Sequence, residues 1–167
     1  MQQLLDFIAY FENSALADNI RENDVLFPLI ESMHVLSICL VVGSIFVVDL
    51  RLLGLASVNR PVSRVTGGIL PLTWSAFAVA VISGSLLFIS NATKYLENGY
   101  FVAKLLLICV AGLNMAIFHG ISAKDQPRWD KKTAPPLPAR LAGGLSILLW
   151  ISVVTSGRWI GFTMEVR

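Results

Sequence analysis

The fold of this chain is decided by the stretch Val65–Thr93, which reads VTGGILPLTWSAFAVAVISGSLLFISNAT and contains no charged residue. A helix that crosses about 30 Å of hydrocarbon needs roughly 20 mainly apolar residues, and this stretch supplies them at about residues 69–90. Three further segments have a similar length and composition, at about residues 26–48, 100–121 and 139–162. We therefore expect an all-α, integral membrane four-helix bundle that forms a single membrane domain over residues 1–167.

The composition agrees with this expectation. Hydrophobic residues make up 55% of the chain and charged residues only 14%, whereas soluble globular domains carry about 25% charged residues. The basic residues fall into short loops rather than along a continuous stripe, so the sequence offers no surface for nucleic acid. Cys39 and Cys109 both lie in apolar runs without a CxxC spacing, and we interpret both as packing residues.

The segments outside the four spans are short. Leu4, Ile8 and Phe11 recur at helical spacing opposite Asp6 and Glu12. This pattern predicts a short N-terminal helix over about residues 1–19 that lies in the membrane interface. The polar, proline-rich segment at residues 122–138 predicts a surface loop that is partly extended.

The lysines and arginines predict the orientation in the membrane. Eight of them flank the loops after the first and third spans, and five lie on the opposite face. The eight are Arg51, Arg60, Arg64, Lys124, Arg128, Lys131, Lys132 and Arg140. Because cytoplasmic loops are enriched in basic residues, we expect both loops in the cytoplasm and both termini outside.

Four ionisable residues fall at membrane depth near the predicted outer face, namely Glu31, His34, Lys104 and Arg158. A helix rise of 1.5 Å per residue places His34 about 12 Å and Lys104 about 6 Å inside their spans. Ionisable groups in hydrocarbon are costly and usually functional, so we predict that these residues form one ligand-binding layer, with Trp159 beside Arg158. The structural alternative is that Lys104 and Arg158 extend to the interface and that Trp159 belongs to an aromatic belt.

His34 is too deep and too short to reach the interface, so it is the leading candidate for a hydrogen-bonding or metal-ligating group. Glu31 and His34 have the Glu-x-x-His spacing of di-iron bundles, but the spans lack the further carboxylates that such sites use. A haem bound by His34 and His119 is disfavoured, because their depths differ by about 16 Å.

Two other features have both a functional and a structural interpretation. A second polar cluster near the cytoplasmic face consists of Asp49, Arg51, His119 and Arg140, in which Asp49 and Arg51 could simply mark a helix end. Small residues also recur at four-residue spacing in two spans, which suits close helix packing within the bundle or a homodimer contact. These residues are Ala76, Ala80 and Gly84 in the second span, and Gly112, Ala116 and Gly120 in the third.

Several of these segments together resemble an uncharacterised bacterial family of small four-helix inner-membrane proteins. They are Glu31-x-x-His34, Asp49-Leu50-Arg51-Leu52-Leu53-Gly54, Phe101-x-x-Lys104 and Gly157-Arg158-Trp159-Ile160. The resemblance implies the four-helix fold and a location in the bacterial inner membrane, but no activity. More distantly, His34 followed by Gly43 is similar to the membrane domain of copper-resistance D-type proteins, although only Met33 accompanies His34 as a copper ligand.

We expect a non-enzymatic binding or accessory subunit that holds a quinone, a haem or a lipid near the outer face. One alternative is a copper-handling permease component with Glu31, Met33 and His34 near its entry. Another is a purely structural subunit of a homo-oligomer or a larger membrane complex. In each case most of the surface would contact the lipid bilayer.

Overall fold

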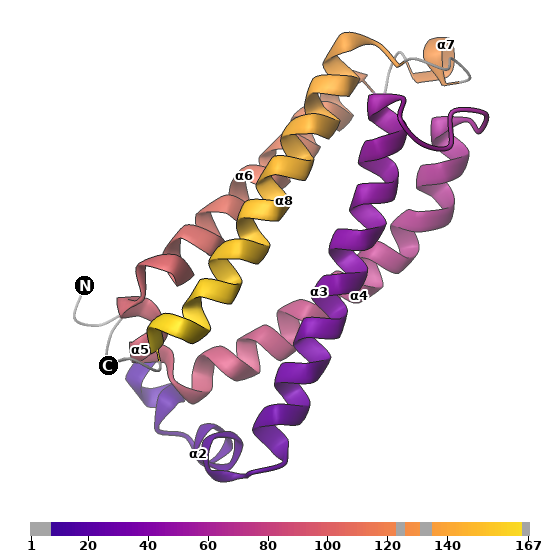
Figure 1. The fold of residues 1–167 in the computed structure, drawn as a ribbon. Helices are drawn as coiled ribbons and strands as arrows, with labels where there is room; N and C mark the ends of the chain where they lie inside the picture. Colours follow the sequence, from indigo (N-terminus) through magenta and orange to yellow (C-terminus); the bar gives the residue numbers. More distant parts are fainter. Residues whose placement is uncertain (1–7, 123–125, 131–134, 165–167) are drawn as a thin grey trace.

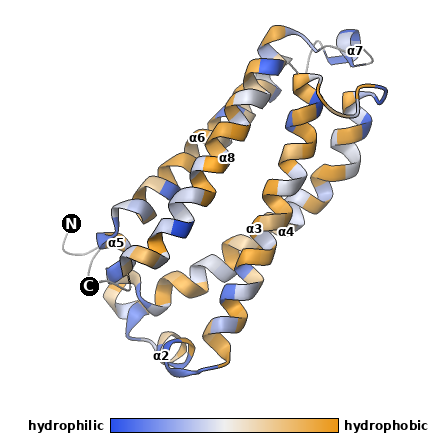
Figure 2. Ribbon diagram, in the orientation of Figure 1, coloured by the Kyte–Doolittle hydropathy of each residue, from blue (hydrophilic) through white to orange (hydrophobic). Residues whose placement is uncertain are grey.

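The computed structural model describes residues 8–122, 126–130 and 135–164, and within them every regular element is a helix. The four long helices are α3 (Leu26–Leu53), α4 (Val62–Ser90), α6 (Gly99–Ser122) and α8 (Leu137–Met164). Each is long and apolar enough to cross a membrane. The predicted all-α four-helix bundle is therefore confirmed, and by helix length and hydropathy the chain is a multi-pass membrane protein in contact with lipid. Figure 2 shows hydrophobic residues over most of the four long helices.

The long helices form two pairs. α3 lies beside α4 and α6 beside α8, and the two pairs are joined mainly along α3 and α8 (Figure 1). The short helices are α2 (Ala15–Glu22), α5 (Ala92–Glu97) and α7 (Gln126–Trp129). α2 and α5 lie at one end of the bundle, here called the α2 end, and α7 lies at the other, the α7 end (Figure 1).

Only one of the two predicted small-residue faces packs within the chain. Ala76 and Ala80 of α4 are buried, and α4 packs chiefly on α3. By contrast, Gly112 is exposed, and a Cβ added to it would meet no atom within 4 Å. The contact between α3 and α8 uses Gly143, where an added Cβ would lie 3.1 Å from both the Asp49 carbonyl oxygen and Leu52 Cβ.

The Asp49–Gly54 segment ends α3 and fixes the loop that follows. Gly54 adopts the left-handed conformation with φ 75°, and the Leu55 N–H donates to the Leu50 carbonyl at 2.9 Å, which closes the last turn. Arg51 is completely buried, and its Nε donates to the Arg60 carbonyl at 2.9 Å. This buried arginine holds the α3–α4 loop against the end of the helix.

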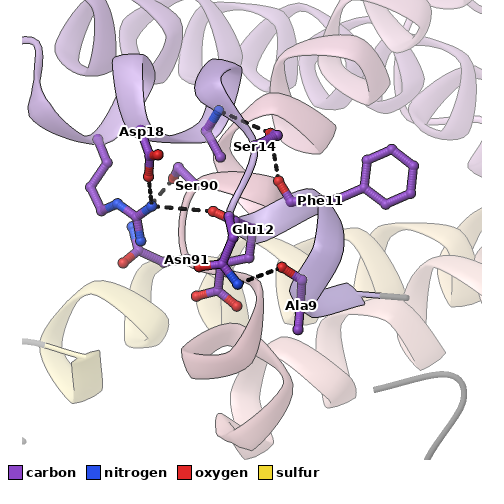
Figure 3. Close-up of polar contacts among 10 residues, drawn as sticks. Ala9, Phe11, Glu12, Ser14, Asp18, Ser90 and Asn91 are labelled. Carbon is purple, nitrogen blue, oxygen red and sulfur yellow. Dashed lines mark hydrogen bonds and ion pairs between the residues drawn. The ribbon is translucent and has the colours of Figure 1, made fainter. Parts of the chain in front are cut away.

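The described part of the N-terminal segment is two short helices rather than one. Residues 8–12 are helical, and α2 starts anew after Ser14, whose hydroxyl oxygen accepts from the Ala17 N–H at 3.3 Å (Figure 3). The beginning of the predicted helix, with Leu4 and Asp6, lies outside the described residues. The Glu12 carboxylate accepts hydrogen bonds from the backbone and side chain of Thr93, so this segment is docked on α5.

The loop predicted at residues 122–138 is more structured than expected in its described part. Trp129 of α7 is buried in a cluster with Leu52, Val62 and Ala139. The next residue, Asp130, accepts hydrogen bonds from the backbone N–H and the hydroxyl of Ser63 at 2.7 and 2.6 Å. Since α4 has no side-chain cap of its own, a carboxylate distant in sequence satisfies its first turn.

Candidate functional site

His34 lies between α3 and α4 and is held by two neighbours on α4. Its Nδ1 is 3.0 Å from the Ser83 hydroxyl oxygen. The Ser83 hydroxyl donates its proton to the Val79 carbonyl at 2.7 Å, so the histidine must be the donor in the bond to Ser83. A neutral imidazole then keeps Nε2 as a hydrogen-bond acceptor. Gly84 lies against the ring, because an added Cβ would be 2.7 Å from His34 Cε1.

Lys104 approaches His34 from the other helix pair. Its Cδ lies 3.7 Å from the position of a Cβ on Gly157, so the absence of a side chain on α8 leaves space for the lysine stem. The ammonium is 5.0 Å from the centre of the Phe101 ring and interacts electrostatically with His34. Within the described part of the chain, no carboxylate forms an ion pair with it. We call His34, Ser83 and Lys104 the His34–Lys104 site.

The depths of these groups are similar. His34 lies about 12 Å along α3 from Leu26, and Lys104 about 8 Å along α6 from Gly99. Both helix starts are at the α2 end of the bundle (Figure 1). An imidazole and an ammonium therefore lie in one layer, below the end of the bundle and across the two helix pairs.

The other residues of the predicted outer layer lie on its periphery. Glu31 is exposed and close to Tyr95 of α5, and burial together with the Glu31 carboxylate raises the pKa of the Tyr95 phenol. Arg158 is exposed, with its guanidinium 4.7 Å from the centre of the Phe162 ring. Trp159 is also exposed and packs edge-on against Phe162. The structure thus places His34 and Lys104 at a similar depth, where they interact electrostatically, and leaves Glu31, Arg158 and Trp159 on the surface.

The second predicted cluster is divided in a similar way. Asp49 and His119 both line a cavity of about 430 Å³ in the α7 half of the bundle. Arg51 is buried beside the α3–α4 loop, and Arg140 is exposed. Neither arginine lines the cavity. Only Asp49 and His119 therefore face a common space.

No metal-ligand set is present in the described ranges, where no three His, Cys, Asp or Glu side chains gather around one point. Glu31 and Met33, the predicted companions of His34 in a copper site, are both exposed. The two histidines of the chain also lie apart, because His34 belongs to the α2 half and His119 to the α7 half. Among the described residues, His34 is thus hydrogen-bonded to Ser83 and belongs to no metal-ligand set.

The residues that position the side chains of His34 and Lys104 were not predicted from the sequence. Ser83 and Gly84 are small residues in an apolar span, and Gly157 is one of several glycines in α8. Serine and glycine are common in membrane helices, where they allow close helix packing, so their presence does not mark a binding site. The cavity residues Asn114 and Ser146 were missed for the same reason.

Comparison with known proteins identifies a family but no function. The model of a family described as "Family of unknown function (DUF6644)" matches residues 11–163. Neither a curated protein nor a solved structure matches the chain significantly. Among the expectations from sequence, membership of an uncharacterised family is thus confirmed.

Proposed function

This chain belongs to DUF6644, a family of unknown function, and we propose that it is a membrane binding or accessory protein that uses the His34–Lys104 site. The ligand is an apolar molecule with an oxygen that accepts hydrogen bonds. A quinone carbonyl, a haem propionate and a phospholipid headgroup share this chemistry. We further propose that the protein lies in a bacterial inner membrane with both termini outside, which places the site near the outer face.

The observation that carries this proposal is the ammonium of Lys104 at membrane depth, which forms no ion pair with a described carboxylate. Charged groups in a hydrocarbon environment are costly unless they pair with an opposite charge, a carbonyl or a ligand. In the described structure the ammonium lies over the Phe101 ring and interacts electrostatically with the His34 imidazole. A cation–π contact supplies only part of the lost hydration. An acceptor oxygen of a ligand would supply a charge-assisted hydrogen bond.

His34 makes a quinone the first candidate. A neutral imidazole that donates from Nδ1 to Ser83 offers Nε2 as an acceptor. The site then presents one donor, Lys104, and one acceptor, His34. A quinone accepts through its carbonyl oxygens, and the reduced quinol can donate through a hydroxyl. An oxidised quinone, like a phosphate diester, has only acceptor oxygens, so it is the quinol hydroxyl that would donate to His34 Nε2. Copper handling receives no comparable support, because the described residues lack a ligand set.

The proposal is tested by measuring what the purified protein carries. The protein would be extracted from its native membrane with a mild detergent, and its absorption spectrum, extractable quinone and bound phospholipid would be determined. We expect bound quinone in the native chain and its loss in Lys104→Met and His34→Ala. A haem spectrum or a Lys104-dependent phospholipid would assign the site to one of the other two ligands.

Two variants serve as matched controls. Arg158→Met removes an exposed cation at the same end of the bundle, and His119→Ala removes the second imidazole. Both should retain the ligand, and circular dichroism should show equal helix content for all four variants. Identical ligand content in the native chain, Lys104→Met and His34→Ala would refute the proposed site. If only His119→Ala lost a component, the binding site would belong to the α7 half instead.

A further inference from the structure

We infer that the cavity in the α7 half is a second binding site, separate from the His34–Lys104 site, and that it takes an organic ammonium ion with an apolar body. All four long helices contribute to its walls, together with Gln126 of α7. Its volume of about 430 Å³ falls within the range of roughly 300–1,000 Å³ that is typical of small-molecule sites. Its lining is predominantly apolar, with a few polar groups, which is also typical of such sites.

The buried carboxylate of Asp49 indicates the charge of the ligand. Asp49 is only 5% exposed, and its Oδ2 atom has no hydrogen-bond partner among the described residues. The Ser146 side chain is a hydrogen-bonding neighbour across the α3–α8 contact. In the described residues no arginine or lysine forms an ion pair with it. A buried carboxylate without a counter-charge costs several kcal/mol, and a bound cation with N–H groups would satisfy it.

Several other polar groups that line the cavity keep a free acceptor atom. Asn114 uses its amide N–H₂ to donate to the Ala142 carbonyl at 3.0 Å, which leaves its oxygen as an acceptor. The Thr73 hydroxyl donates to Ser44 at 2.8 Å. His119 Nδ1 lies 2.9 Å from the Met115 carbonyl and therefore donates to it, so a neutral ring keeps Nε2 as an acceptor. Together with Asp49, the Asn114 oxygen and His119 Nε2 therefore offer acceptors to a ligand that donates several hydrogen bonds.

The aromatic walls complete this assignment. Trp74, Phe77, Phe118 and Trp150 all line the cavity. The faces of aromatic rings attract organic cations, and tryptophan does so most strongly. An ammonium group at Asp49 with a hydrocarbon body against these rings would satisfy both the charge and the apolar surface. An anion would be repelled by the Asp49 carboxylate.

The cavity is accessible from the side of the bundle. α4 and α6 belong to different helix pairs and share almost no contacts. Trp74 of α4 and Met115 of α6 line the cavity and are also exposed. A ligand dissolved in the bilayer could therefore enter between these helices, which suits an amphiphilic amine.

A matched set of three probes tests the inference. Phenylbutylamine, phenylbutanol and phenylbutyrate share an apolar body and differ in charge. Their saturable binding to the full chain in nanodiscs of zwitterionic lipid would be measured by equilibrium dialysis, with empty nanodiscs as background. We expect the amine to bind best, the alcohol weakly and the carboxylate not at all. Because Asn keeps the shape of Asp but loses its charge, Asp49→Asn should weaken amine binding by at least about tenfold.

Three variants separate this inference from loss of folding and from the first site. Gly112→Leu adds a side chain to the cavity wall at a position where a Cβ meets no atom within 4 Å, so it should block the amine without disturbing the helices. Glu31→Gln removes an exposed carboxylate at the other end of α3, and Lys104→Met alters only the His34–Lys104 site; both should bind the amine normally. Equal binding of amine and alcohol, normal binding by Asp49→Asn, or binding no greater than that of empty nanodiscs would overturn the inference.

Discussion

The imidazole of His34 occupies the space that a side chain at position 84 would need. A Cβ atom on Gly84 would lie 2.7 Å from His34 Cε1 and 3.3 Å from Nδ1. The neighbouring residue, Ser83, supplies the hydrogen-bond partner of the same ring. A glycine and a serine in succession on α4 thus create both the room and the polar contact for a histidine at membrane depth.

Gly84→Ala should therefore displace the imidazole. The added methyl group would break the hydrogen bond to Ser83, a loss of about 1 kcal/mol, while alanine favours the helix by about the same amount over glycine. We expect nearly unchanged thermal stability but strongly reduced ligand content at the His34–Lys104 site. Gly43→Ala is the control, because no atom lies within 4 Å of its Cβ position. Equal ligand content in the two variants would contradict this prediction.

Two adjacent glycines of α8 should respond differently to the same substitution. A Cβ on Gly143 would lie 3.1 Å from the Asp49 carbonyl oxygen, a backbone atom that cannot rotate away, whereas a Cβ on Gly144 would make an ordinary contact of 3.7 Å with Leu53. Overpacking typically costs about 1–3 kcal/mol, so Gly143→Ala should destabilise the bundle. Gly144→Ala should be neutral or slightly stabilising. Unfolding midpoints in detergent would compare them, and similar midpoints would show that α3 and α8 can move apart.

The long helices could be predicted from sequence because each requires only about 20 apolar residues in succession. The end of the first span and the start of the second could not. The first span was predicted to end near residue 48, but α3 continues to Leu53 because Arg51 is buried against the α3–α4 loop. The second span was predicted to start near residue 69, but α4 starts at Val62, where Asp130 binds its first turn. Both extensions depend on contacts with distant residues.

The sequence predicted the depth of the site residues in the membrane, but not the direction in which their side chains point from the helix axes. Counting residues placed His34 and Lys104 in one layer with Arg158. It gave no direction for their side chains, because lipid-facing and core-facing positions are both apolar in a membrane helix. Whether Lys104 or Arg158 faces inward is decided by packing, since Gly157 leaves space for the Lys104 stem. The cavity depends on the separation of the helix pairs, which no local pattern encodes.

The titration of Tyr95 should report on its neighbour Glu31. Burial first and the Glu31 carboxylate second raise the pKa of this phenol. The folded state then holds the proton more tightly than the unfolded state, so the free energy of unfolding should be constant below the ordinary tyrosine pKa of about 10 and fall as the pH rises through the folded-state pKa. Glu31→Gln should lower the pKa of Tyr95, but not to its ordinary value, because burial persists.

Tyrosinate absorbance during an alkaline titration measures this effect. The chain has three tyrosines, so Tyr95→Phe is needed to identify which transition belongs to Tyr95. The absorbance transition at the highest pH, which we assign to Tyr95, should disappear in Tyr95→Phe and move to lower pH in Glu31→Gln. An unchanged Tyr95 transition in Glu31→Gln would show that the carboxylate does not act on the phenol in the membrane.

The orientation of the bundle can be tested at two exposed positions. Asn59 lies in the α3–α4 loop and Asp24 between α2 and α3, and both are exposed. Because the basic residues are concentrated in and beside the α3–α4 and α6–α8 loops, the positive-inside rule predicts that the α7 end faces the cytoplasm. In a chain with Cys39→Ser and Cys109→Ser, an impermeant thiol reagent should label Asp24→Cys in intact cells and Asn59→Cys only after permeabilisation. Since the α3–α4 loop and α7 lie at one end of the bundle (Figure 1), the reverse labelling pattern would show that the whole bundle has the opposite orientation. The His34–Lys104 site would then lie on the cytoplasmic side, and its ligand would have to come from the inner leaflet.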